Sequence, residues 1–269
     1  MHICLASTPT DLNYIDLPLL YSNKYYLMSM LFLKDTKLSK EYYGEAVKRN
    51  FLLIDSGAHT FQKLENNLDG LDKWIKVYIQ FLKKNQDYWN TYVEMDIDNR
   101  IGYKQVAEIR QHLWDETGVP PMPVWHGKDH YYYNDGFNRT IQDWKNYCKT
   151  FPYVGLSGAT PVQYLPKMLE YAHKHKCQVH GFAFTSPTKV FQYDFDTVDS
   201  TSWMQLFRYG NITMFNGDVP KIIKNYKLKF DLNPKYGRNF GFAEWCKFSR
   251  RVELHWELKK HFEPKPLYI

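Results

Sequence analysis

The chain has 269 residues, of which 17% are aromatic, including 22 tyrosines. This composition excludes intrinsic disorder and collagen-like repeats. A chain of this length buries about three quarters of its surface on folding, which suffices for one barrel-sized domain or two smaller ones. The net charge of +6 is modest and favours anionic partners without identifying one.

The positive charge is concentrated near the C-terminus. Residues 221–265 contain 12 Lys and Arg against 5 Asp and Glu, so the rest of the chain is nearly neutral. Aromatic residues are interleaved with these cations, a mixture that suits phosphates and stacked bases, although a solvated amphipathic helix shows the same pattern. We expect residues 1–220 to form the main domain and residues 221–269 a basic helical segment packed on it.

The four cysteines are far apart and lack zinc or redox spacing, so neither a metal nor a cofactor is expected. No window approaches 18 uninterrupted apolar residues, and the N-terminus lacks the basic and apolar regions of a signal peptide. These features predict a cytoplasmic protein without a membrane partner. They leave the oligomeric state open.

Short apolar runs alternate with segments of helical spacing along the chain. The expected strands are His2–Ser7, Tyr25–Phe32, Phe51–Ile54, Tyr92–Ile97, Met122–Trp125, Tyr153–Leu156, Gln178–Phe184 and Thr197–Asp199. The expected helices are Lys40–Lys48, Asp72–Lys84, Tyr103–Trp114, Phe137–Cys148 and Val162–His173. About eight βα units predict an α/β fold, a (β/α)8 TIM barrel, with a doubly wound open sheet as the alternative.

Three aspartates stand where expected strands end: Asp55, Asp96 and Asp199. Catalytic groups of barrel enzymes lie at these ends, and paired carboxylates support nucleophilic and acid/base chemistry at an anomeric carbon. Each aspartate alone is equally suited to cap the following helix. His126 is a candidate base, and with His180 a weaker candidate for metal binding, since no HxH or HExxH spacing occurs.

Short motifs surround these strand ends in a fixed order. They are Asp55-Ser56-Gly57-Ala58, Met95-Asp96, Trp125-His126-Gly127, Gly155-Leu156, and Phe184-Thr185-Ser186-Pro187 followed by Val198-Asp199-Ser200. With these motifs the chain resembles the tRNA-guanine transglycosylase (queuine tRNA-ribosyltransferase) superfamily, whose counterparts are DSGG, a strand-end Asp, VQG, GGL and GxGxP…FD. The resemblance spans residues 51–200 and implies a TIM-barrel enzyme that exchanges bases without a cofactor.

The resemblance also implies a role for each matching position. Asp199 would attack C1′ of the sugar and expel guanine, and Asp55 would be the general acid/base. Asp96, or its near neighbour Asp98, would read the edge of the purine, while His59 and Phe182 would sandwich its ring. The other implied substrate contacts are Ser56, His126, Gly127, Gly155 and the amide of Leu156.

The chain departs from the tRNA enzymes at two places. After Asp199 it lacks the Cys-x-Cys-x-x-Cys…His zinc site, and no Glu follows Gly155-Leu156. Both departures match small relatives, often phage-encoded, that exchange guanine in DNA for a 7-deazaguanine such as preQ0. We therefore expect two partners, a free 7-deazaguanine and DNA whose target base is flipped or single-stranded, in the host cytoplasm if the protein is phage-encoded.

For the DNA backbone, the basic segment is expected to supply phosphate contacts beside the barrel mouth. The candidates are Lys247, Arg250 and Arg251, together with Arg208. Three alternatives remain: a tRNA-guanine transglycosylase, a non-catalytic nucleic-acid-binding barrel, and a barrel glycoside hydrolase, which leaves the basic segment unexplained.

Overall fold

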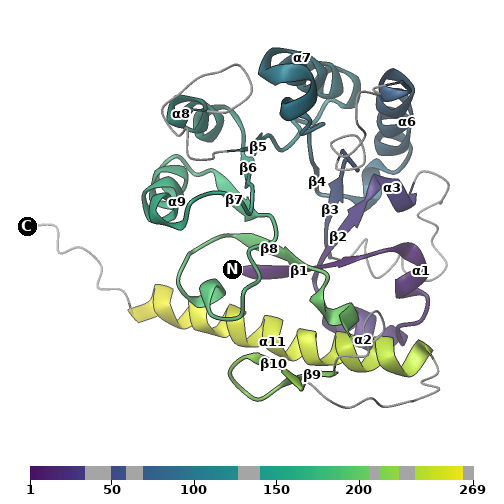
Figure 1. The fold of residues 1–269 in the computed structure, drawn as a ribbon, viewed down its shortest axis with the longest axis vertical. Helices are drawn as coiled ribbons and strands as arrows, with labels where there is room; N and C mark the ends of the chain where they lie inside the picture. Colours follow the sequence, from purple (N-terminus) through teal and green to yellow (C-terminus); the bar gives the residue numbers. More distant parts are fainter. Residues whose placement is uncertain (34–49, 59–68, 127–139, 206–211, 224–233, 263–269) are drawn as a thin grey trace, which may run out of the picture.

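Eight parallel strands form a single curled sheet in a computed structural model of the chain (Figure 1). The structure describes residues 1–33, 50–58, 69–126, 140–205, 212–223 and 234–262. The strands are β1 (His2–Ser7), β2 (Tyr25–Ser29), β3 (Phe51–Asp55), β4 (Thr91–Tyr92), β5 (Val124–Trp125), β6 (Tyr153–Leu156), β7 (Gln178–Gly181) and β8 (Thr197–Ser200). Their order in the sheet is β4-β3-β2-β1-β8-β7-β6-β5.

The two edge strands of this sheet meet just beyond β4. Val93 forms a parallel bridge with Met122, whose amide donates to the Tyr92 carbonyl at 2.7 Å. The Glu94 amide in turn donates to the Met122 carbonyl at 3.0 Å. The sheet therefore curls until its edges are hydrogen-bonded, and the expected α/β fold of TIM-barrel type is confirmed.

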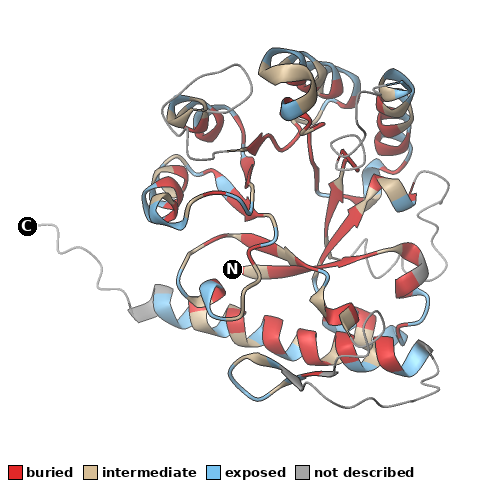
Figure 2. Ribbon diagram, viewed as in Figure 1, coloured by how far each residue is buried: buried red, intermediate tan, exposed pale blue. Residues whose placement is uncertain are grey.

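Helices surround the sheet and turn their buried faces toward it (Figure 2). They are α1 (Pro9–Leu12), α2 (Leu17–Ser22), α3 (Met30–Leu33), α6 (Leu71–Lys84), α7 (Asp98–Thr117), α8 (Ile141–Thr150), α9 (Leu165–Lys174) and α11 (Pro234–Phe262). Short 3-10 turns occupy Gln86–Tyr88, Val162–Tyr164, Lys189–Phe191 and Ser202–Met204. The expected helix Lys40–Lys48 lies outside the described residues. Within the described ranges, no helix has the length and apolar character needed to cross a membrane.

Alternation along the strands separates two layers of core. One set of side chains fills the inside of the curled sheet, and the other packs between the sheet and the helices. The inner set consists of Cys4, Ala6, Leu27, Leu53, Val93, Met122, Val124 and Tyr153. Asp55 and Asp199 are in phase with this inner set on β3 and β8, so their carboxylates emerge at the end of the barrel interior.

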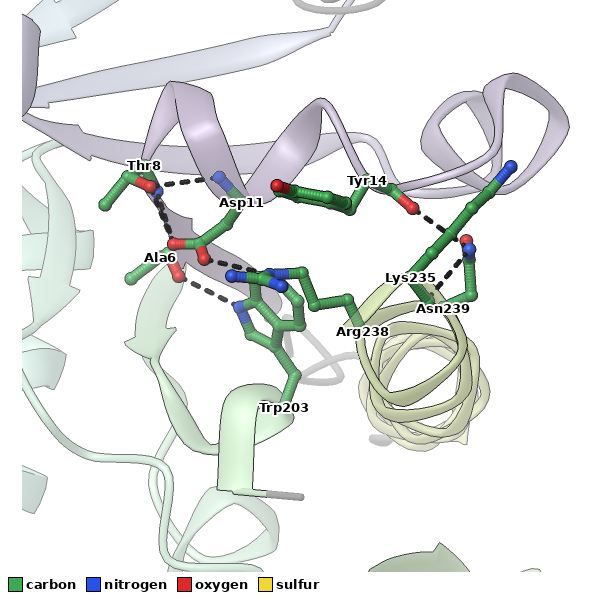
Figure 3. A network of polar contacts seen from close by, with 8 residues as sticks. All are labelled: Ala6, Thr8, Asp11, Tyr14, Trp203, Lys235, Arg238 and Asn239. Atoms are coloured by element: carbon green, nitrogen blue, oxygen red, sulfur yellow. Dashed lines mark hydrogen bonds and ion pairs between the residues drawn. The ribbon is translucent and has the colours of Figure 1, made fainter. Parts of the chain in front are cut away.

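The first turns of α11 are fixed to α1 by a polar network (Figure 3). Arg238 Nε donates to Asp11 Oδ1 at 3.2 Å, and both side chains are buried. Asp11 also accepts from the hydroxyl of Thr8 at 2.7 Å, and Trp203 Nε1 donates to the Ala6 carbonyl at 2.9 Å. Because Ala6 and Thr8 lie at the C-terminal end of β1, the first turns of α11 are held beside the end of the barrel at which the strands finish.

Most aromatic residues of α11 belong to the core, which contradicts their expected role in base stacking. Buried in the layer between sheet and helices are Phe242, Trp245, Phe248 and Trp256. Tyr236 and Phe240 are exposed. The expected domain boundary at residue 220 falls inside β10 (Pro220–Ile223), which pairs with β9 (Ile212–Phe215) in an antiparallel hairpin that contacts α11.

A buried carboxylate supports the closure of the sheet. Glu94 is fully buried; its Oε1 accepts the Val124 amide at 2.7 Å, and its Oε2 pairs with Arg110 Nη1 at 3.0 Å. Tyr147 accepts a further hydrogen bond from Arg110 at 3.0 Å. The pair thus links the end of β4, the start of β5 and helix α7.

Replacing this carboxylate with an amide, Glu94→Gln, leaves Arg110 buried without its counter-charge. We expect the free energy of unfolding, measured by urea denaturation, to fall by about 3–5 kcal/mol. The control is Glu116→Gln, which removes an exposed pair with Lys83 and is expected to cost less than about 1 kcal/mol. Equal losses in the two variants would contradict the assigned role of Glu94.

Candidate active site

Three carboxylates converge at the C-terminal ends of the strands. Asp55 ends β3, Asp96 follows β4, and Asp199 lies in β8. The pKa of Asp55 is raised from 3.8 to about 6, chiefly by burial and also by the charges of Asp96 and Asp199. Hydrogen bonds from Ser29 and the Gly57 amide lower it and so offset part of this rise. The structure therefore places the three aspartates that stand at predicted strand ends in one electrostatic environment.

A cavity of about 530 Å³ opens at this end of the barrel. Asp55 and Asp199 both line it, together with side chains from β1, β2, the segment after β7 and the segment after β8. Its other lining residues are Ala6, Ser7, Thr8, Leu27, Ser29, Phe32, Phe182, Ala183, Thr201 and Met204. The two predicted catalytic carboxylates thus face one space large enough for a nucleoside-sized group.

Asp199 is held by contacts to one of its two oxygens. Its Oδ1 accepts the Ala183 amide at 2.8 Å and lies 3.5 Å from His180 Nε2. Ala183 adopts a φ of 57°, a left-handed conformation that is uncommon for alanine and that accompanies functional sites. Neither contact involves Oδ2.

Phe182 lies in the mouth because two glycines make room for it. A Cβ on Gly155 would approach the Phe182 ring to 2.7 Å, and one on Gly158 would approach the Phe182 carbonyl to 2.8 Å. The ring packs edge-on against His180, with centroids 4.5 Å apart. Gly155 therefore leaves room for Phe182, which lines the cavity.

Asp96 and Asp98 have different environments. Asp96 is 3.4 Å from the ring of His126, measured from Oδ2 to Nε2, and it influences the pKa of Asp55. Asp98 is buried in the first turn of α7. Asp96 is therefore close enough to act on Asp55 and has His126 beside it, although the residues that line the cavity include neither Asp96 nor His126.

Two of the predicted substrate contacts occupy structural positions instead. Ser56 is fully buried, and its carbonyl accepts from Trp74 Nε1 at 3.0 Å. Leu156 is buried in the core layer between the sheet and the helices. The amides of Gly155 and Ser157 donate to β5, so the amide of Leu156, which lies between them, points to β7 on the other side of the strand. Both positions differ from the expected contact with substrate.

Three other predicted residues, His59, Gly127 and Arg208, lie outside the described residues. Their expected contacts remain predictions.

The cations expected beside the mouth lie farther along α11. Arg250 pairs with Glu253 at 3.0 Å, and Glu253 contacts His2, the first residue of β1, also at 3.0 Å. That is the N-terminal end of the sheet, opposite Asp55. Lys247 pairs with Glu244, and Arg251 lies 3.9 Å from Asp218 in the hairpin turn. The expected placement of Arg250 beside the mouth is therefore wrong.

Several residues of the site were not identified from the sequence. Ser29 and Phe32 line the cavity, and the Ala183 amide holds the nucleophile candidate. Ser29 and Phe32 lie near the end of the expected strand Tyr25–Phe32, and this position is the feature of the sequence that could have identified them. No motif points to Ala183, because its role depends on its backbone conformation. Within the described part of the chain, no group of three or more His, Cys, Asp or Glu is arranged to hold a metal ion.

Comparisons with known proteins identify no family for the chain. No protein-family model matches the chain, nor does any curated protein. Among solved structures, an enolase protein from the environmental genome shotgun sequencing of the Sargasso Sea is similar, with 10% sequence identity and a TM-score of 0.41. The match covers 73% of this chain and 54% of that one. A similarity of this size says nothing about the chemistry of the site.

The raised pKa of Asp55 predicts a pH-dependent stability difference for Asp55→Asn. Asp55 binds its proton more tightly when folded, so the stability contributed by its protonated form is lost as the pH rises from about 4 to about 6. Asparagine does not ionise and so avoids this loss. Above pH about 7 we expect the variant to be more stable than wild type by about 2 kcal/mol, less than the full pKa shift would give because the side chain of Asp55 is partly exposed. Below pH about 4 the two proteins should be equally stable.

The measurement is urea denaturation across this pH range. Asp115→Asn, an exposed carboxylate on α7, is the control and should show no such trend. A stability difference for Asp55→Asn that does not change with pH would contradict the environment assigned to Asp55.

Proposed function

We propose that this chain is a DNA-guanine transglycosylase that exchanges guanine for a 7-deazaguanine through a covalent intermediate on Asp199. The observation that supports the proposal is that Asp55 and Asp199 line the same cavity. The pKa of Asp55 is raised toward neutral pH, and Asp199 is held through one of its two oxygens. Two carboxyl groups with different environments suit the two roles of a retaining mechanism.

In the first displacement, Asp199 Oδ2 attacks C1′ of the deoxyribose. The C1′–O bond forms as the bond from C1′ to guanine N9 breaks, and the electron pair of that bond goes to N9. Asp55, whose pKa is raised to about 6, is protonated in about a tenth of the molecules at pH 7, and this form donates its proton to the departing base. The products are free guanine and a deoxyribosyl ester on Asp199.

In the second displacement, the incoming base attacks C1′ from the side that guanine left. The C1′–N bond forms, the C1′–O bond breaks, and its electron pair returns to the Asp199 carboxylate. Asp55 accepts the N9 proton of the new base and so returns to its starting state. Two displacements give net retention at C1′.

Asp96 and His126 would read the edge of the base. Asp96 and His126 supply a carboxylate and an imidazole 3.4 Å apart, which suits hydrogen bonding to the donors and acceptors of a purine edge. Phe182 offers an aromatic face for stacking on the ring. Sequence departures from the tRNA enzymes favour DNA over tRNA, and tRNA is the second candidate substrate.

Base exchange gives a direct test. Wild-type protein is incubated with labelled guanine or preQ0 and, separately, single-stranded DNA, duplex DNA and tRNA, and uptake of label is measured. We expect uptake into DNA, a loss of at least about 10³-fold in Asp199→Ala, and a loss of about 10²–10⁴-fold in Asp55→Asn. Asp115→Asn should match wild type.

Denaturing electrophoresis should also show a DNA adduct that Asp199→Ala cannot form. Uptake of label into tRNA alone would show that tRNA, the second candidate, is the substrate. Wild-type protein that labels neither nucleic acid would refute base exchange.

Exposed Phe32 on α3 provides a test of how DNA approaches. Its side chain is 52% exposed and lines the cavity, so it can stack on a base next to the one in the mouth. We expect Phe32→Ala to weaken binding of labelled single-stranded DNA, measured by fluorescence anisotropy, by about 1–3 kcal/mol. Leu258→Ala, of similar exposure at 54% but near the end of α11, is the control; equal losses would contradict stacking at Phe32.

A further inference from the structure

A chain of buried polar side chains lies beneath Asp199, inside the barrel. The hydroxyl of Tyr153 is hydrogen-bonded to the hydroxyl of Thr197, which lies 2.7 Å from His180 Nδ1. His180 Nε2 is 3.5 Å from Asp199 Oδ1. All three residues below Asp199 are buried, and the imidazole of His180 is 0% exposed. The mechanism above uses none of them.

One arrangement of the protons at Thr197 leaves the imidazole of His180 protonated at Nε2. A threonine hydroxyl has one proton to donate and two lone pairs that accept. Burial keeps the pKa of Tyr153 well above its ordinary value, so this side chain retains the proton that it can donate to Thr197. The proton of Thr197 is then available for His180 Nδ1, and the imidazole carries its own proton on Nε2.

The opposite end of the chain favours the same tautomer. With the proton on Nδ1, the lone pair of Nε2 would face the Asp199 carboxylate at 3.5 Å, which is electrostatically unfavourable in a buried site. With the proton on Nε2, an N–H faces that oxygen. In the described part of the chain, His180 Nε2 makes no hydrogen bond, and the nearest acceptor charge is this carboxylate.

We propose that His180 is a positioning residue for Asp199: the Tyr153–Thr197 relay holds its imidazole as the Nε2–H tautomer, and this N–H stabilises the charge on Asp199 Oδ1. The catalytic part of this inference rests on the proposed function of Asp199. The Ala183 amide donates to the same oxygen, so two donors from β7 and the residues after it restrain Oδ1 and orient Oδ2 toward C1′.

A donor at Oδ1 matters most when the carboxylate is the leaving group. In the second displacement the C1′–O bond breaks and a full negative charge returns to Asp199, inside a site where burial strengthens electrostatic interactions. At 3.5 Å the contact is at the outer limit of a hydrogen bond; catalytic contacts of this kind are often long in the free enzyme and shorten in the complex.

The matched pair Thr197→Val and Thr197→Ser tests the relay. Valine has the same shape but no hydroxyl, whereas serine keeps it. We expect Thr197→Val to lower kcat for base exchange about tenfold and to increase the fraction of DNA trapped as the covalent adduct. The KM for DNA should fall in parallel with kcat, because only the second displacement is slowed. Thr197→Ser should restore kcat, and thermal unfolding verifies that both variants fold.

Nitrogen-15 NMR of His180 tests the tautomer without substrate. Wild type should show a protonated Nε2 and an unprotonated Nδ1, while Thr197→Val should show a mixture of tautomers. A wild-type spectrum with the proton on Nδ1, or equal kcat in the valine and serine variants, would overturn the inference. A wild-type protein without base exchange would refute the proposed function instead, and the spectrum would still decide whether the relay exists.

Discussion

The buried carboxylate of Glu94 determines where the sheet closes, and the site follows from that closure. One oxygen accepts the Val124 amide and the other pairs with Arg110, so β4 and β5 are held together with α7 behind them. Asp96 lies two residues beyond Glu94, and His126 two residues beyond Val124. The same contact that joins the edges of the sheet therefore brings these two side chains within 3.4 Å of each other.

The barrel is closed below the site by aromatic rings at its N-terminal end. His2 stacks on Tyr25 with centroids 4.0 Å apart, Tyr25 contacts Phe51 at 5.6 Å, and Phe51 contacts Tyr153 at 6.1 Å. These rings fill the interior, so the cavity opens at the other end. At that other end, burial is the largest contribution to the raised pKa of Asp55.

Sequence patterns predicted where the strands lie, because each strand is a short apolar run and parallel strands expose their carboxyl ends together. The convergence of Asp55, Asp96 and Asp199 followed from that rule. The expected strands Tyr25–Phe32, Tyr92–Ile97 and Gln178–Phe184 end earlier than expected, at Ser29, Tyr92 and Gly181. The roles within α11 did not follow, since composition does not say which helix face is buried or at which end of the barrel a cation lies. Phe242 and Arg250 illustrate the two errors, and Ala183 shows that a backbone conformation leaves no motif.

The charge of the mouth constrains how the proposed DNA substrate enters. Three carboxylates converge there, so a phosphate placed among them is repelled, and the backbone of DNA must pass outside the cavity. Only the base and its sugar are neutral enough to enter, which requires the nucleotide to leave the stack. Arg238 lies beside the mouth, but it is buried and paired with Asp11. It therefore holds α11 in place and does not serve as a contact for the DNA backbone. Stacking on exposed aromatic side chains at the rim, rather than attraction to the site itself, must therefore offset the energy of unstacking.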